Sequence, residues 1–148
     1  MDSAELLCSS EGARLTSLRR EVLEFVWRGH EAVKAYEILA HLSAERRSPK
    51  PPTVYRALQF LLERGLVHRL ESLSAFVGCP EPGARHAGQF LICEKCGWVS
   101  ELKTPGIHDA IAEGAERAGF RVGRETVEVM GVCQACDGSA GPVGGRVP

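Results

Sequence analysis

Two pairs of cysteines with Cys-x-x-Cys spacing are the residues of this chain best suited to chemistry. They are Cys93, Cys96, Cys133 and Cys136. Four thiolates offered by two tight turns suit tetrahedral Zn²⁺, for which the Zn–S distance is about 2.3 Å. Gly97 follows the first pair and Gly138 follows the second, and glycine favours the turns that such a site needs. The spacing therefore predicts one four-cysteine zinc site.

The segment between the two pairs is longer than the ~15–20 residues of a simple zinc ribbon. We therefore expect a structured piece of chain there, with its two ends held together by the metal. An iron–sulfur cluster and a thiol–disulfide switch are the alternative uses of these cysteines. A zinc hydrolase or deaminase is not expected, because four cysteine ligands leave no open coordination position for water and substrate.

A second group of possible metal ligands combines imidazole, thiolate and carboxylate donors. Its members are His68, Cys79, His86 and Glu101. Each of them alone would more often have a structural role, but together they form a donor set that suits a four-coordinate Zn²⁺ ion. The sequence therefore indicates a second zinc site, and about two zinc ions per chain.

The composition is that of a folded chain outside the membrane. Of the 148 residues, 44% are hydrophobic, which supports a packed core. No apolar stretch approaches the ~18 residues that a membrane-spanning helix needs, and residues 1–5 lack the features of a signal peptide. We expect a cytoplasmic protein, whose cysteines act as thiols or metal ligands rather than as disulfides.

The net charge of −1 is unevenly distributed along the chain. Residues 14–56 contain nine Lys or Arg and five Glu, so this stretch carries a charge of +4 while the remainder carries about −5. A basic segment on a nearly neutral protein fits contact with a polyanion such as DNA. Ordinary solvated helix faces are the alternative explanation.

Helical periodicity and turn residues define the N-terminal elements. Apolar residues repeat every three or four positions within residues 15–26, 35–42 and 54–62, which predicts three helices. The third helix begins near Pro52 and ends at Gly65. Short strands are expected at residues 66–71 and 75–79. This order predicts a winged helix-turn-helix DNA-binding domain over residues 1–79.

In that arrangement the third helix enters the major groove of DNA. Arg56 is the best candidate for a base contact, because a guanidinium group can bind O6 and N7 of guanine together. The N–H groups at the helix start, where Thr53 lies, favour a phosphate. The candidate DNA contacts are Thr53, Tyr55, Arg56, Gln59, Arg19, Arg20 and Lys50. The alternative is that Tyr55 and Arg56 only decorate an exposed helix.

The chain changes character after a hinge at residues 80–86, which contains two prolines and a glycine. Strands are expected at residues 89–92 and 98–102, on either side of the first cysteine pair. A helix follows from Thr104 to Gly119, and residues 120–132 are expected to form strands. The helix is expected to have an apolar face made of Ile107, Ala110, Ile111, Ala115 and Ala118. Residues 87–136 therefore form a small α+β domain, and the Gly/Pro-rich residues 137–148 are expected to be a disordered tail.

Two segments of this chain resemble the Fur family of metal-dependent repressors, and within it the zinc uptake regulators. They are residues 51–58 (PPTVYRAL) with 60–63 (FLLE), and residues 90–97 (FLICEKCG). The resemblance extends over about residues 14–136. It implies that the C-terminal α+β domain makes a homodimer, that the four cysteines hold a structural zinc, and that His68, Cys79, His86 and Glu101 hold a regulatory zinc.

The resemblance implies a zinc-responsive repressor of zinc uptake genes that binds palindromic operator DNA, not an enzyme with a small-molecule substrate. Sensors of iron, manganese or peroxide are the alternatives within the family. Iron-sensing members carry closely spaced histidines before the first cysteine pair, where this chain has the sequence HAGQ at residues 86–89. A thiolate ligand at Cys79 fits manganese least, because that ion prefers oxygen.

Overall fold

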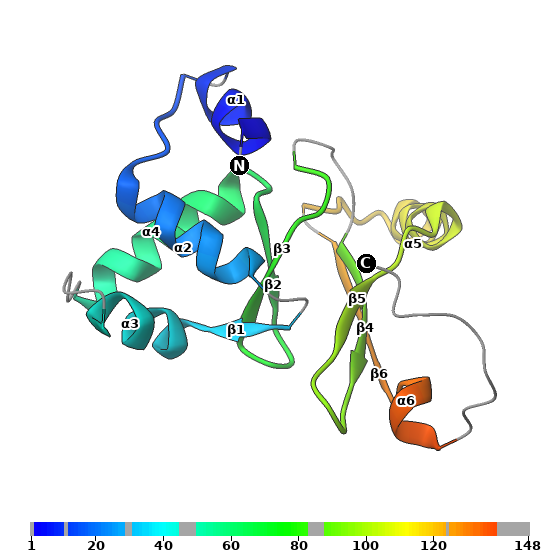
Figure 1. Ribbon diagram of the computed structural model, residues 1–148. Coiled ribbons are helices and arrows are strands. Elements are labelled where there is room, and N and C mark those ends of the chain that lie inside the picture. Colours follow the sequence, from blue (N-terminus) through cyan, green and yellow to red (C-terminus); the bar gives the residue numbers. More distant parts are fainter. Residues whose placement is uncertain are drawn as a thin grey trace. The chain divides into compact units, whose positions relative to one another are not determined.

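The computed structural model describes residues 2–10, 12–28, 31–44, 50–82, 88–123 and 125–138. The chain divides into two compact units, residues 1–86 and residues 87–148. Helices and strands occur in both units (Figure 1). No helix in the described ranges is both long enough and apolar enough to cross a membrane.

The first unit is built mainly from helices. These are α1 (Asp2–Ser10), α2 (Ser17–Trp27), α3 (Ala35–Ala44) and α4 (Pro51–Glu63). The first two residues of α4 are prolines, whose fixed φ and missing N–H suit the first turn of a helix. α4 ends in a Schellman motif: Gly65 has φ +61°, its N–H donates to Leu62 O, and the N–H of Leu66 donates to Leu61 O.

In the described part of the first unit, three short strands form an antiparallel sheet in the order β1-β3-β2. The strands are β1 (Val33–Lys34), β2 (Val67–Leu70) and β3 (Ala75–Gly78). β2 and β3 form a hairpin in which Val67 pairs with Gly78 and His68 pairs with Val77. Helices followed by this hairpin make a winged helix-turn-helix, in which α4 is the recognition helix and β2–β3 is the wing.

One hydrophobic core holds this unit together. The inward-facing residues come from α2, α3, α4 and the wing, with two residues of α1 added: Ala4, Cys8, Val22, Leu23, Val26, Ile38, Leu42, Val54, Leu58, Leu61, Leu66 and Val67. Val22, Val54 and Leu61 have no exposed surface at all. Because α2 and α4 share this core, the position of the recognition helix is fixed chiefly by apolar packing.

The second unit is a mixed α+β domain. Its elements are β4 (Gly88–Cys93), β5 (Val99–Glu101), α5 (Pro105–Arg117), β6 (Thr126–Gly131) and α6 (Gln134–Asp137). In the described part of the unit the strand order is β5-β4-β6. β5 pairs with β4 antiparallel and β6 pairs with β4 parallel. Since parallel neighbours need a crossover, the chain leaves β4 and passes through β5 and α5 before it returns as β6.

Several elements differ from the sequence-based prediction. α1, the two-residue β1 and the one-turn α6 were not predicted, because each is too short or too weakly periodic to stand out. Strands were expected through residues 120–132, but the structure has one strand there, β6. In the described part of this stretch before β6, residues 120–123 form no strand: Phe120 is 68% exposed and Gly123 lies in a bend.

The apolar face expected on α5 is present but is not covered. No residue of α5, which is described over its whole length, is buried. Ile111 is 36% exposed, and Val129 and Met130 on β6 are 45% and 43% exposed. By contrast, β4 contains buried residues on both faces. The second unit therefore leaves apolar surface on α5 and β6 that its own described residues do not bury.

We expect that Leu61→Ala destabilises the first unit by about 2–5 kcal/mol, because it removes a fully buried side chain and leaves a cavity. The matched control is Leu6→Ala on α1, where the side chain is 71% exposed and the change should stay within about 0.5 kcal/mol. Urea unfolding followed by circular dichroism measures both. Equal losses for the two variants would show that Leu61 is not part of a packed core.

Candidate metal centre and DNA interface

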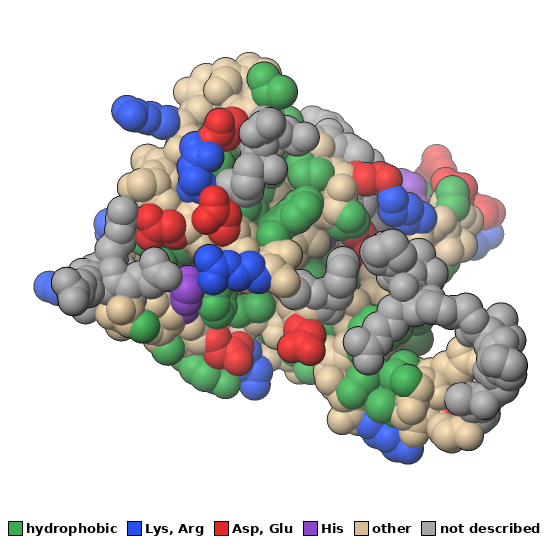
Figure 2. Space-filling view, in the orientation of Figure 1, with side chains coloured by type: hydrophobic (Ala, Val, Ile, Leu, Met, Phe, Trp, Pro, Cys, Tyr) green, Lys and Arg blue, Asp and Glu red, His purple; other side chains and the backbone are tan. Residues whose placement is uncertain are grey.

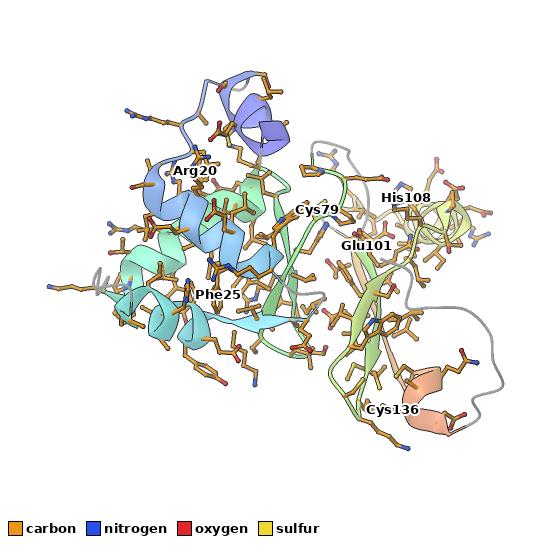
Figure 3. The ribbon with its side chains drawn as sticks, in the orientation of Figure 1. Arg20, Phe25, Cys79, Glu101, His108 and Cys136 are labelled. Carbon is orange, nitrogen blue, oxygen red and sulfur yellow. The ribbon has the colours of Figure 1, made fainter. Side chains whose placement is uncertain are left out.

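The four cysteines come together at one end of the second unit's sheet. Cys93 ends β4 and Cys96 lies in the turn that leads to β5. Cys133 follows β6 and Cys136 lies on α6, where Figure 3 labels it. β4 and β6 run parallel with Cys93 opposite Gly131, so both strands deliver their cysteine turns to the same end of the sheet. The predicted four-cysteine cluster is therefore present.

The geometry of this cluster fits a tetrahedral zinc ion. All four Sγ atoms lie within 4.8 Å of one another. A Zn–S distance of about 2.3 Å requires neighbouring sulfur atoms ~3.8 Å apart in a regular tetrahedron. The Sγ atoms of Cys96 and Cys133 are 3.7 Å apart. None of the six cysteines, all of which lie in the described ranges, forms a disulfide.

Backbone hydrogen bonds hold the two cysteine turns in place. The N–H of Gly97 donates to Cys93 O, and Gly97 has φ +74°, which a residue with a side chain rarely adopts. The N–H of Cys133 donates to the Sγ of Cys93 at 3.3 Å. Lys95 Nζ donates to Cys136 O at 3.1 Å and so links the first turn to α6. The site is thus oriented by the chain itself.

The four thiols differ in acidity. The backbone N–H of Cys133, together with that of Cys96, lowers the pKa of Cys93 to about 6 by stabilising its thiolate. The neighbouring Cys133 and Cys96 sulfur groups raise the pKa of Cys136 to about 12. The pKa of Cys96 is also raised, since the effects of Cys93, Cys133 and burial outweigh a hydrogen bond from the backbone of Trp98. Without a positive ion, ionisation of Cys93 is therefore favoured, whereas ionisation of Cys96 and Cys136 is opposed.

The residues of the predicted second zinc site are distributed over both units. His68 lies half-buried on β2, and Cys79 is buried directly after β3. Both belong to the first unit. Glu101 ends β5 in the second unit, where it is half-buried and pairs with Phe90. His86 lies outside the described residues. Within the described ranges, the four-cysteine cluster is the only group of three or more ligands that meets, so the second site stays a prediction.

The candidate DNA contacts on α4 lie on its solvent face. Thr53, Tyr55, Arg56 and Gln59 are all exposed, and so is Lys50, the residue that precedes the helix. Val54, Ala57, Leu58 and Leu61 face the core instead. Gln59 donates a hydrogen bond to Glu63 Oε1 at 2.9 Å on the same face. The helix therefore presents a row of polar side chains to solvent, as groove recognition requires.

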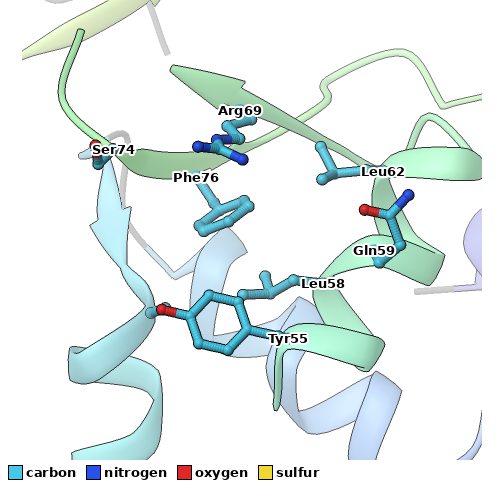
Figure 4. Close-up of a pocket in the computed structure, with 8 residues that line it drawn as sticks. Tyr55, Leu58, Gln59, Leu62, Arg69, Ser74 and Phe76 are labelled. Atoms are coloured by element: carbon cyan, nitrogen blue, oxygen red, sulfur yellow. The ribbon is translucent and has the colours of Figure 1, made fainter. Parts of the chain in front are cut away.

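A shallow hollow of about 160 Å³ separates this face of α4 from the wing. Tyr55 and Gln59 border it from α4, and Arg69 and Phe76 border it from the wing (Figure 4). Arg69 is half-exposed on β2 and forms an ion pair with Glu71 at 3.1 Å. The sequence analysis did not single out Arg69, although a basic residue within the strand expected at residues 66–71 was the available signal.

Arg19 and Arg20, also predicted to contact DNA, are engaged within the first unit. Arg19 Nη1 donates to Arg14 O at 2.7 Å, and its guanidinium group lies 3.5 Å from the centre of the Phe60 ring. Arg20 forms an ion pair with Glu5 of α1 (Figure 3 labels Arg20). Basic and acidic side chains alternate on the face of this unit seen in Figure 2. The role of Arg19 and Arg20 in DNA contact stays a prediction.

Comparison with known proteins adds independent information. Residues 10–130 match the model of the ferric uptake regulator family. The zinc uptake regulation protein of Escherichia coli (strain K12) is 39% identical over 136 residues, which cover 90% of this chain and 78% of the relative.

Solved structures give the same picture. A zinc uptake regulator complexed with zinc and DNA is 37% identical and has a TM-score of 0.88 over 93% of each chain. The crystal structure of holo XcZur is 40% identical, with a TM-score of 0.85 over 93% of this chain and 96% of that one.

We expect zinc binding to the four cysteines to release protons. At pH 7 Cys93 is largely thiolate because its pKa is lowered, whereas Cys96 and Cys136 keep their protons because their pKa values are raised. Zinc must displace these two protons, so its affinity should rise by about a hundredfold or more per pH unit near neutrality. Fewer than four protons should be released at pH 7.

Calorimetric zinc titration of reduced, metal-free protein in buffers of different protonation enthalpy counts the protons released. Cys136→Ser should lower the count, and Cys8→Ala, which changes a cysteine far from the cluster in sequence, should not. Zinc affinity that is independent of pH would show that the thiols are already ionised.

Proposed function

Because this chain belongs to the Fur family of transcriptional regulators, we propose that it is a zinc-responsive repressor of zinc uptake genes. In this proposal a homodimer binds palindromic operator DNA in the cytoplasm when a regulatory zinc ion is bound. The observation that carries the proposal is a four-cysteine cluster in a chain that also contains a winged helix and is 39% identical to a zinc uptake regulation protein. The protein acts by binding DNA and is not an enzyme.

The four-cysteine cluster holds a structural zinc ion in this proposal. Cys93 and Cys96 come from one end of the sheet's central strand, and Cys133 and Cys136 follow its parallel neighbour. Zinc held there crosslinks two segments that are far apart in the sequence. Four protein ligands fill its coordination shell, so the ion has a structural and not a catalytic role.

We place the regulatory zinc ion on His68, Cys79, His86 and Glu101. The donors support this assignment, because two imidazoles, one thiolate and one carboxylate suit tetrahedral Zn²⁺ and fit manganese poorly. His68 belongs to the wing and Cys79 directly follows it, whereas Glu101 belongs to the second unit. An ion bound by these residues ties the wing to the second unit and restricts the motion of the DNA-binding units.

A homodimer is supported by the surface of the second unit. Large apolar side chains are exposed on α5, on β6 and beside these elements: Ile111, Phe120, Val122, Val129, Met130 and Val132. In the described sheet, β6 is an edge strand, whose unpaired backbone groups favour association. Exposed apolar surface next to a strand edge is typical of a subunit interface. A second copy of this unit would cover both features.

The exposed face of α4 reads the operator in this proposal. Arg56 binds the edge of a guanine in the major groove, while Lys50 and the N-terminus of α4, where Thr53 lies, bind phosphate. Two such helices in a dimer must meet half-sites about 34–36 Å apart, or a multiple of that distance. Free DNA-binding units meet this requirement only part of the time, so restricting them raises the affinity for DNA.

A thiol redox sensor is the second candidate, because four sulfur atoms within 4.8 Å of one another are close enough to exchange metal for disulfides. Zinc content and free thiols measured before and after mild oxidation distinguish the two functions. A redox sensor loses DNA binding when its zinc is released by oxidant. A zinc sensor follows the zinc concentration under fully reducing conditions.

We predict that His86→Ala abolishes the zinc dependence of operator binding while the dimer persists. Coupling of about 1–3 kcal/mol corresponds to an affinity change of ~5–150-fold across a buffered zinc series. A duplex selected from a random pool by the zinc-loaded protein serves as the operator in gel shifts. Wild-type zinc dependence in this variant would falsify the assignment of His86 as a ligand.

Arg56→Ala is the control that separates DNA reading from metal sensing. Loss of a bidentate guanine contact should weaken operator binding by about 1–3 kcal/mol at saturating zinc. The number of zinc ions bound per chain should not change, because Arg56 lies on the solvent face of α4. Zinc content is measured by elemental analysis on the same samples.

We predict that Val129→Asp dissociates the dimer, because the carboxylate would be placed in an apolar interface. The dimer dissociation constant should rise by more than about tenfold, or 1.4 kcal/mol. Leu6→Asp is the matched control, since Leu6 is also exposed and apolar but belongs to the first unit. Sedimentation velocity across a concentration series measures both. An unchanged constant for Val129→Asp would place the interface elsewhere.

A further inference from the structure

Trp27, the last residue of α2, makes an unusually close contact with the wing. A Cβ atom built on Gly78 would lie 2.7 Å from both Cδ1 and Nε1 of the indole ring. The ring therefore rests directly on the backbone of Gly78. Glycine is a weak strand former, and its φ here is not in the left-handed region. The end of β3 is therefore occupied by a glycine because any larger residue there would collide with the ring of Trp27.

The same indole ring reaches a backbone carbonyl that also anchors Cys79. Trp27 Nε1–H donates to Leu66 O at 3.4 Å, and the N–H of Cys79 donates to this oxygen at 3.1 Å. Leu66 comes just before β2, and Cys79 comes just after β3. Their hydrogen bond therefore closes the open end of the hairpin, and Trp27 covers it from α2.

This end of the hairpin determines the positions of the two residues, Cys79 and His68, that the first unit contributes to the proposed regulatory zinc site. Cys79 follows Gly78 directly, and His68 lies two residues after Leu66 on the neighbouring strand, paired with Val77. A shift of the Leu66 and Gly78 backbones would move the Cys79 thiol and the His68 ring relative to each other. Metal binding tolerates such shifts poorly, since ligand distances are fixed to within a few tenths of an ångström.

We propose that Trp27 is a positioning residue for the regulatory zinc site, holding Cys79 and His68 in the geometry that binds the metal. This proposal rests on the proposed function, which assigns the two residues as ligands. Trp27 also connects the site to DNA reading, because α2 carries Val22, Leu23 and Val26 into the core that supports α4. The indole remains 46% exposed, so core burial alone does not account for its place.

Residues that orient metal ligands without touching the metal usually change its affinity by about 10–100-fold when they are replaced. Trp27→Leu removes both the ring contact and the N–H donor, and Gly78→Ala pushes the ring away with a single methyl group. Both should weaken the regulatory zinc by about tenfold. Trp27→Phe keeps an aromatic ring over Gly78 and should restore most of the affinity.

The experiment uses the full-length chain with its four-cysteine zinc in place. Competition with a zinc chelator of known affinity measures the second zinc ion, and cobalt added to the second site reports the Cys79 thiolate through its charge-transfer absorption. Tyr36→Leu is the matched control, because Tyr36 is another exposed aromatic of the first unit and lies outside the hairpin. Cys79→Ser tests the ligand itself.

The expected result is a weaker second zinc and an altered cobalt–thiolate band in Trp27→Leu and Gly78→Ala, with Tyr36→Leu unchanged. If Cys79→Ser weakens the second zinc but Trp27→Leu and Gly78→Ala stay within about twofold of the wild type, the positioning role is overturned and the zinc sensor stands. If the wild type binds no second zinc, or Cys79→Ser binds it normally, the assigned regulatory site and the positioning role both fail.

Discussion

The parallel pairing of β4 with β6 is the constraint on which the second unit depends. It brings residues 93 and 131 opposite each other although they are 38 positions apart in the sequence. Only this register carries both cysteine turns to one end of the sheet, where four sulfur atoms fall within 4.8 Å. A zinc ion there offsets the loop-closure cost of a parallel pair, which is otherwise high for so small a sheet.

The first unit uses a different source of order. Its helices pack by apolar contact, and special backbone geometry fixes where α4 starts and stops: prolines at its N-terminus and the Schellman motif at Gly65. The motif also leads the chain directly into β2. The hydrogen bond from the N–H of Leu66 to Leu61 O holds the end of the recognition helix next to the start of the wing, and both residues are fully buried. The polar face of α4 is presented to solvent as a consequence of this packing.

Much of this architecture could be predicted because its causes are local in the sequence. The Cys-x-x-Cys spacing predicted the four-cysteine cluster, and the periodicity of Val54, Leu58 and Leu61 predicted the buried face of α4. Contacts that depend on distant partners could not be predicted. The ion pair of Arg20 with Glu5 needs α1, which has too little periodicity to be recognised, and the contact of Trp27 with Gly78 joins residues 51 positions apart.

The exposed face of α5 shows a second limit of prediction from sequence, which concerns the partner of an apolar face. Its apolar periodicity was predicted correctly, but periodicity cannot tell whether the partner lies in the same chain. No residue of the helix, which is described throughout, is buried. The face is apolar, as a buried face would be, but the chain itself does not cover it. Such a face indicates a partner outside the chain, which is the physical basis for proposing a homodimer through this unit.

The two zinc sites in the proposal have opposite requirements, and their ligands reflect this. A structural ion must stay bound at the lowest zinc concentrations, and four thiolates on turns already held by backbone hydrogen bonds lose little freedom on binding. A sensor must empty and fill within the physiological range. Ligands drawn from two units must be ordered by the ion itself, and this ordering cost lowers the affinity. When the regulatory metal is bound, the DNA-binding unit is already ordered. The ordered unit binds its half-site without a further ordering cost, so the metal raises the affinity for DNA.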